Sequence, residues 1–138
     1  MGTIPRNIIA VIVGLVVGSI VNMALIMLSG QVVPAPAGAD VTTMEGLQAS
    51  MHLFEPKHFV FPFLAHALGT LVGAFVASML AATQRMKLAL LVAVLFLVGG
   101  IVNVVLLPSP LWFTALDLIV AYIPMGWLGH KLALGVRQ

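Results

Sequence analysis

Two ionisable side chains interrupt apolar segments in which a lipid-facing helix would carry leucine. His66 lies within "FPFLAHALGTLVGAF", residues 61–75, and Asp117 lies within "LWFTALDLIV", residues 111–120. A carboxylate inside a bilayer costs about 2.5–3.5 kcal/mol on insertion scales, so we expect Asp117 to face a partner or water. An imidazole and a carboxylate that share one proton would spare both groups the cost of full burial. The pair is therefore a candidate site for proton exchange.

Further polar side chains are predicted at a similar depth. At 1.5 Å per helical residue, Asn22, His66, Asn103 and Asp117 all lie roughly 6–11 Å below the outer end of their helices. Thr70 shares the face of His66, and other polar groups flank Asp117. Together they predict a small polar chamber, with a binding or proton-relay set made of His66, Asp117, Asn22, Asn103, Thr70, Thr114 and Tyr122. No catalytic residue is assigned.

A structural role competes with this interpretation. Polar side chains in membrane helices also hydrogen-bond neighbouring helices, which is worth about 0.6 kcal/mol on average. That role is the simpler explanation for either asparagine alone. For His66 and Asp117 together we favour a functional role. Each ionisable group is costly to place in a bilayer, so two at one depth are hard to explain by packing alone.

The composition indicates the elements that must position these groups. Of the 138 residues, 62% are hydrophobic and 7% are charged, whereas soluble domains carry about 25% charged residues. Four apolar runs reach the roughly 20 residues needed to cross a bilayer. The first is longer than the apolar region of a secretory signal. We predict an all-α membrane protein, a four-transmembrane-helix bundle forming one domain over residues 1–138, with helices at about 8–28, 59–82, 88–107 and 111–134.

Small residues recur at helical spacing on three of these runs. Such patterns let helix backbones approach closely, so we predict helix packing at Gly14, Gly18, Gly69, Gly73 and Gly99. We also expect Pro124 to kink the fourth helix, because proline lacks a backbone N–H.

The chain also contains a possible internal repeat. "LVVGSIVNMALI", residues 15–26, aligns with "FLVGGIVNVVLL", residues 96–107, and the two share a G-x-I-V-N string. The repeat predicts two parallel helical hairpins related by an axis along the membrane normal.

The first loop is predicted to hold a short amphipathic helix at about 43–54. Thr42 and Glu45 have the spacing of a capping box. One face of the segment is apolar, with Met44, Leu47, Met51 and Phe54. We expect this helix to lie at the outer membrane surface or to cover the bundle; the alternative is a solvated loop.

Metal and cofactor sites are weakly indicated. His52, Glu55 and His58 are weak metal candidates, because Pro56 interrupts the helix that would align them. The absence of cysteine excludes thiolate ligands. A bis-histidine haem needs a second buried histidine near His66. No cofactor is expected.

Charge placement orients the bundle. The basic residues Arg6, Arg85, Lys87, Lys131 and Arg137 flank one set of helix ends, and the first loop contains the acids Asp40, Glu45 and Glu55. The positive-inside rule then places both termini in the cytoplasm, and we expect an integral protein of a bacterial inner membrane. The pI near 9.5 rests on six basic residues, so nucleic-acid binding is not expected.

Three functions are consistent with these residues. The first is binding or proton-coupled transport of a small solute or ion, as a homo-oligomer or with a membrane-protein partner. Because four helices enclose little volume, a sizeable cargo would need a second copy of the chain. The second is an accessory or assembly subunit of a larger membrane complex. The third is an enzyme acting on a lipid-like substrate, for which the sequence offers no recognisable nucleophile.

Overall fold

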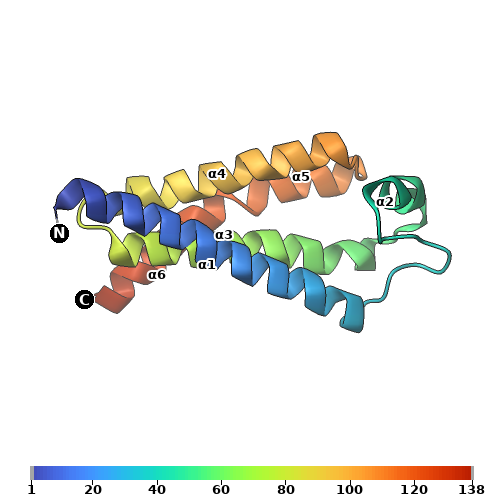
Figure 1. The fold of residues 1–138 in the computed structure, drawn as a ribbon, viewed down its shortest axis with the longest axis horizontal. Helices are drawn as coiled ribbons and strands as arrows, with labels where there is room; N and C mark the ends of the chain where they lie inside the picture. Colours follow the sequence, from blue (N-terminus) through green and yellow to red (C-terminus); the bar gives the residue numbers. More distant parts are fainter. Residues whose placement is uncertain (1, 138) are drawn as a thin grey trace.

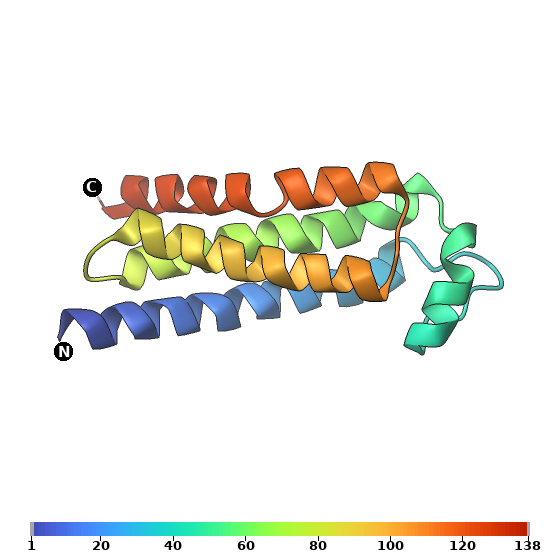
Figure 2. The ribbon, with the colours of Figure 1, turned by 90° about the horizontal axis from the view of Figure 1, so that it is seen from above.

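Long helices arranged side by side make up the structure, a computed structural model that describes residues 2–137 (Figures 1 and 2). No strand occurs within that range. The four predicted runs correspond to four segments that are long and apolar enough to cross a membrane. Their helices are α1 (Thr3–Val32), α3 (Val60–Leu80), α4 (Arg85–Leu106), and α5 (Leu111–Val120) followed by α6 (Ile123–Arg137). The predicted all-helical class is confirmed.

The α1–α3 pair packs through glycines. A Cβ built on Gly14 would lie 2.6 Å from the carbonyl oxygen of Gly73, and one on Gly18 would lie 2.6 Å from that of Gly69. These distances are far below van der Waals contact, so only glycine permits this approach. Helices α1 and α3 therefore approach closely at these four glycines.

Gly99 does not pack in this way within residues 2–137. A Cβ there meets no atom of the described residues within 4 Å, whereas one on Gly100 would lie 2.5 Å from the Tyr122 hydroxyl oxygen. Adjacent helical residues point about 100° apart, and it is Gly100 that faces the fourth run. Gly18 and Gly99, which align in the internal repeat, therefore have different surroundings. The repeat itself stays a prediction.

The fourth run is divided by a turn at Ala121 and Tyr122, where Figure 2 shows the break between α5 and α6. Pro124 cannot donate the hydrogen bond that the Val120 carbonyl would accept in a continuous helix. The helix therefore breaks near the predicted kink. Tyr122 is buried at this break.

The N-terminus, the α3–α4 loop and the C-terminus share one end of the molecule, and α2 (Met44–Ser50) lies at the other (Figure 2). Three arginines donate to carbonyls at the C-terminal end of α3. Nε of Arg6 donates to Leu80 at 2.8 Å, Nη1 of Arg137 to Met79 at 2.9 Å, and Nε of Arg85 to Ala81 at 3.3 Å. Positive charges at a helix C-terminus also interact favourably with the helix dipole.

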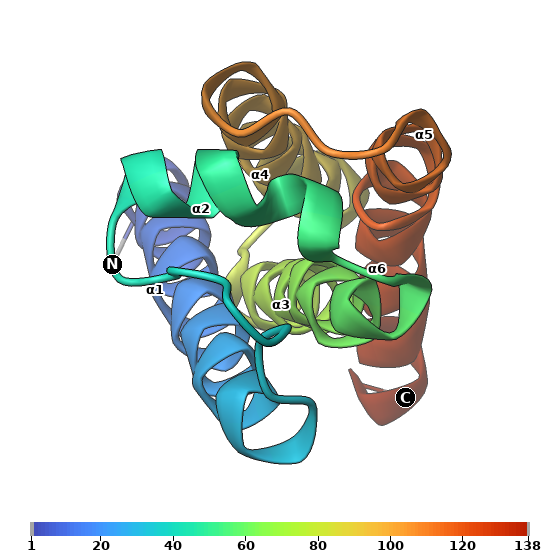
Figure 3. The same ribbon diagram turned by 90° about the vertical axis from the view of Figure 1, so that its right-hand side faces the viewer.

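At the opposite end, α2 lies across the bundle, as the end-on view in Figure 3 shows. A 3₁₀ turn, η1 (Met51–Leu53), continues it, so the loop contains the expected helix. The predicted capping box is wrong: Thr43 caps the helix and accepts from the Gly46 N–H at 2.9 Å. The Thr42 hydroxyl instead donates to Asp40 at 2.6 Å, and this bond lowers the pKa of Asp40.

Candidate functional site

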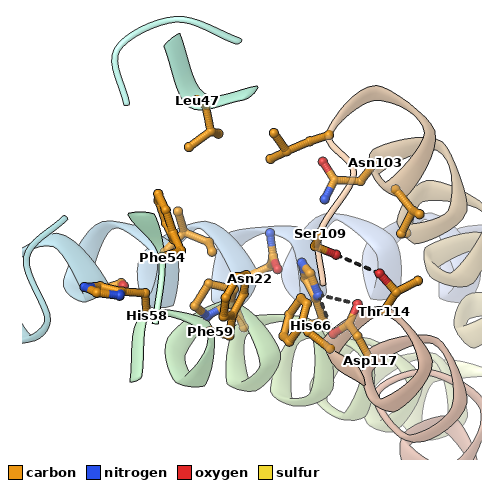
Figure 4. A pocket seen from close by; sticks show the side chains of 18 of the residues that line it. Asn22, Leu47, Phe54, His58, Phe59, His66, Asn103, Ser109, Thr114 and Asp117 are labelled. Carbon is orange, nitrogen blue, oxygen red and sulfur yellow. Dashed lines mark hydrogen bonds and ion pairs between the residues drawn. The ribbon is translucent and has the colours of Figure 1, made fainter. Parts of the chain in front are cut away.

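His66 of α3 and Asp117 of α5 are in direct contact. Nδ1 of His66 lies 2.8 Å from Oδ1 and 3.0 Å from Oδ2 of Asp117, as drawn in Figure 4. The Asp117 side chain is 4% exposed and that of His66 is 19% exposed. The predicted contact is therefore present. The carboxylate is enclosed by protein, while the imidazole keeps an open edge.

Tyr122 adds a third group to the pair. Its hydroxyl donates to Oδ2 of Asp117 over a long 3.5 Å, and its ring stacks on His66 with centroids 5.9 Å apart and planes 23° apart. Because the α5–α6 turn brings Tyr122 inward, the break in the fourth run contributes directly to the site.

The pair borders a cavity of about 690 Å³. The cavity is lined by all seven polar residues of the predicted set: Asn22, His66, Thr70, Asn103, Thr114, Asp117 and Tyr122. Cavities of 300–1,000 Å³ are of the size that holds drug-sized ligands. The cavity lies between helices of a single chain, because α1 and α4 separate toward the α2 end (Figure 1) and both line it.

Two threonines in the set have distinct roles. The Thr70 side chain is buried, and within residues 2–137 its hydroxyl has no hydrogen-bond partner. An unsatisfied buried polar atom costs about 1–3 kcal/mol, so such atoms call for a ligand or a water. The Thr114 hydroxyl, by contrast, pairs with the Ser109 hydroxyl at 2.8 Å. Sequence reasoning missed Ser109, which lies in the turn before α5.

The rest of the cavity wall is apolar and aromatic. Helix α2 supplies Leu47, and Phe54 follows it in the same loop (Figure 4). Met51, directly after α2, also lines the wall. Phe59 and Phe113 also line the wall, with ring centroids 4.6 Å apart. The site thus combines a polar group of side chains near Asp117 with an apolar part beneath α2.

Two of the three weak metal candidates, Glu55 and His58, cap a helix instead. The Glu55 N–H donates to Nδ1 of His58 at 2.8 Å, and the Glu55 side chain accepts from the His58 N–H. This reciprocal cap begins the 3₁₀ helix η2 (Pro56–Phe59). His52 is exposed. The described part of the chain brings no three histidine, aspartate or glutamate side chains together in a metal-binding arrangement.

A second buried pair, formed by a histidine and a serine, was not predicted from the sequence. Nδ1 of His130 in α6 lies 2.8 Å from the Ser78 hydroxyl oxygen in α3, and both residues are buried. Gly126 and Gly129 precede His130 on a small-residue face of α6 that packs on α3 and α4. That spacing was the available signal. This pair lies toward the basic end, away from the cavity.

Comparisons with known protein families, with curated proteins and with solved structures found no match to this chain. The function must therefore be argued from its own residues.

Proposed function

We propose that this chain is a small integral membrane protein that binds a small solute or ion in the outer cavity and couples its movement to a proton at His66 and Asp117. One observation carries the proposal: the only acid within the four membrane-length segments lies 2.8 Å from a histidine and borders a cavity of about 690 Å³. A purely structural pair does not need an adjoining cavity of this size.

The coupling follows from charge. With one shared proton the pair is neutral as a unit, which keeps its cost in the bilayer low. Removing that proton leaves a net negative charge beside the cavity, and this state favours a solute that restores neutrality. A ligand shifts such an equilibrium by as much as its affinities for the two states differ. The exposed edge of His66 gives the proton a route to the cavity.

The setting is part of the same proposal. The lipid bilayer is the solvent of the exposed apolar helix faces. We place the protein in a bacterial inner membrane with both termini in the cytoplasm, as a homo-oligomer or with a membrane-protein partner. The alternative function, an accessory subunit of a larger complex, predicts co-purification of a stoichiometric membrane partner and no solute-coupled proton movement by the chain alone.

The proposal is tested by proton movement in liposomes. Purified protein is reconstituted around a pH-sensitive dye, and a gradient is imposed with three non-titrating probes: phenyltrimethylammonium, benzenesulfonate and phenyl methyl sulfone. We expect at least one probe to drive proton movement, and we expect Asp117→Asn and His66→Ala each to reduce its rate at least tenfold, because each removes one partner of the pair.

The controls are Glu45→Gln and His52→Ala, which neutralise another carboxylate and remove another imidazole outside the cavity lining. Both should keep the wild-type rate. If Asp117→Asn and His66→Ala fold normally and also keep it, the proposed function is wrong.

A further inference from the structure

We infer that the cavity binds an organic monocation, an ammonium group carrying an apolar body, and that this cation and the shared proton compete for Asp117. This inference rests on the proposed function and names the class of solute. Three properties of the cavity wall lead to it: its charge, its aromatic content and its unsatisfied hydroxyl.

The charge of the wall is one-sided. Asp117 is the only acid among the described residues that line the cavity, and no lysine or arginine lines it. An anion would have to approach the carboxylate with only the imidazoles of His66 and His58 to attract it. A cation meets a carboxylate without an opposing fixed charge. In a low-dielectric cavity such a difference decides which ion enters.

The apolar part of the wall suits an organic cation better than a metal ion. Five aromatic side chains line the cavity: Phe54, Phe59, Phe96, Phe113 and Tyr122. Aromatic faces attract ammonium groups, by about 2 kcal/mol or more where water is excluded. A small inorganic cation would need several oxygen ligands, and the apolar wall beneath α2 would offer it nothing. A cavity of about 690 Å³ also exceeds what a single ion requires.

The Thr70 hydroxyl indicates that the ammonium carries N–H groups. Thr70 follows His66 by one helical turn on the same face of α3, lines the cavity and has no partner within residues 2–137. Asn22 and Asn103 supply amide oxygens to the same space. A protonated amine therefore finds acceptors for its N–H groups, one of them a charged carboxylate.

The exchange balances in charge. The pair begins with one shared proton; the cation binds, Asp117 remains a carboxylate, His66 becomes neutral, and the proton leaves to water. The other group facing Asp117 that can titrate is Tyr122, from the α5–α6 turn. The α4 residues that line this part of the cavity, Gly100 and Asn103, are uncharged. Binding of the cation should therefore release one proton and strengthen as pH rises.

Calorimetry on the whole chain in lipid nanodiscs tests the ligand class. Phenyltrimethylammonium should bind at least tenfold more tightly than the similarly sized benzenesulfonate and phenyl methyl sulfone. Titrations in buffers of different ionisation enthalpy should show release of about one proton per cation. Equal or tighter binding of the anion or the neutral probe overturns the ligand class, as does cation binding without proton release.

A second variant separates the hydroxyl from the charge. Thr70→Val keeps the side-chain shape and removes a hydroxyl that has no partner, so it should not destabilise the fold. We expect it to weaken binding of benzylammonium several-fold and to leave phenyltrimethylammonium, which has no N–H, unchanged. Unchanged benzylammonium binding overturns the role of Thr70.

Failure of this inference is distinguishable from failure of the proposed function. If benzenesulfonate or the sulfone drives proton movement that Asp117→Asn abolishes, transport stands and the cation assignment falls. If no probe drives movement that depends on Asp117, both fall.

Discussion

Tyr122 keeps its place beside Asp117 because α4 leaves room for its hydroxyl. A Cβ on Gly100 would lie 2.5 Å from the Tyr122 hydroxyl oxygen, whereas the neighbouring Gly99 faces open space. The two glycines therefore form an internal comparison. Both line the cavity, but only at Gly100 would an added Cβ collide with Tyr122.

Gly100→Ala should displace Tyr122 and disturb the pair. We expect a several-fold loss of proton movement and a stability loss of about 1–3 kcal/mol from overpacking. Gly99 lines the same cavity, but an added Cβ there meets no atom of residues 2–137 within 4 Å. Gly99→Ala should therefore reduce proton movement less than Gly100→Ala does and should gain up to about 1 kcal/mol from helix propensity. Thermal unfolding and the liposome assay measure both effects. Equal responses of the two variants would show that Tyr122 does not support the site.

At the scale of elements, hydropathy located the helices but not their ends. The first run was predicted at 8–28, and α1 spans Thr3–Val32. The extra turns at its start are polar and are held by contacts that hydropathy does not register, such as the Asn7 side chain accepting from the Ala82 N–H at 2.9 Å. Hydropathy marks the part of a helix that crosses lipid, and the helix continues beyond it.

The rotation of each helix was harder to predict than its position. A membrane helix is apolar on nearly every face, so the hydrophobic pattern says little about which face turns inward. Polar and small residues supplied the missing information where they were numerous, as for His66 and Asp117 or Gly14 and Gly73. Where two glycines are adjacent, at Gly99 and Gly100, spacing alone does not show that it is Gly100 that faces Tyr122.

The sequence predicts a helix in the first loop but not which residue caps it. The apolar stripe located α2, but Thr42 and Thr43 are chemically equivalent candidates for its cap. The choice depends on Asp40, whose side chain binds Thr42 and leaves Thr43 free to cap the helix. Such local competition between backbone partners is decided by geometry that residue spacing does not contain.

At the scale of the whole molecule, charge divides the two ends. Arg6, Arg85 and Arg137 gather at the C-terminal end of α3, while Asp40, Glu45 and Glu55 lie in the loop at the α2 end. The arginines thus have a structural role in capping α3 and also match the cytoplasmic side under the positive-inside rule.

Because the chain has no cysteine, its orientation can be measured with single substitutions. Ala37→Cys, in the first loop, should react with a membrane-impermeant maleimide added to spheroplasts, whose inner membrane is intact. Val136→Cys, exposed near the C-terminus, should react only after permeabilisation. The reverse pattern would place the cavity on the cytoplasmic side and contradict the proposed orientation.

Because the chain has only four acidic residues, the protonation of Asp117 can be measured directly. Of these four acids, Asp40, Glu45 and Glu55 lie outside the membrane-length segments, which leaves Asp117 as the single acidic side chain within them. Infrared difference spectroscopy of protein in lipid, with ¹³C-labelled aspartate, reports the protonation of that group. We predict a buried-carboxyl signal that changes when phenyltrimethylammonium binds, is altered in His66→Ala and is absent in Asp117→Asn. A signal indifferent to the cation and to His66 would contradict a shared, exchangeable proton.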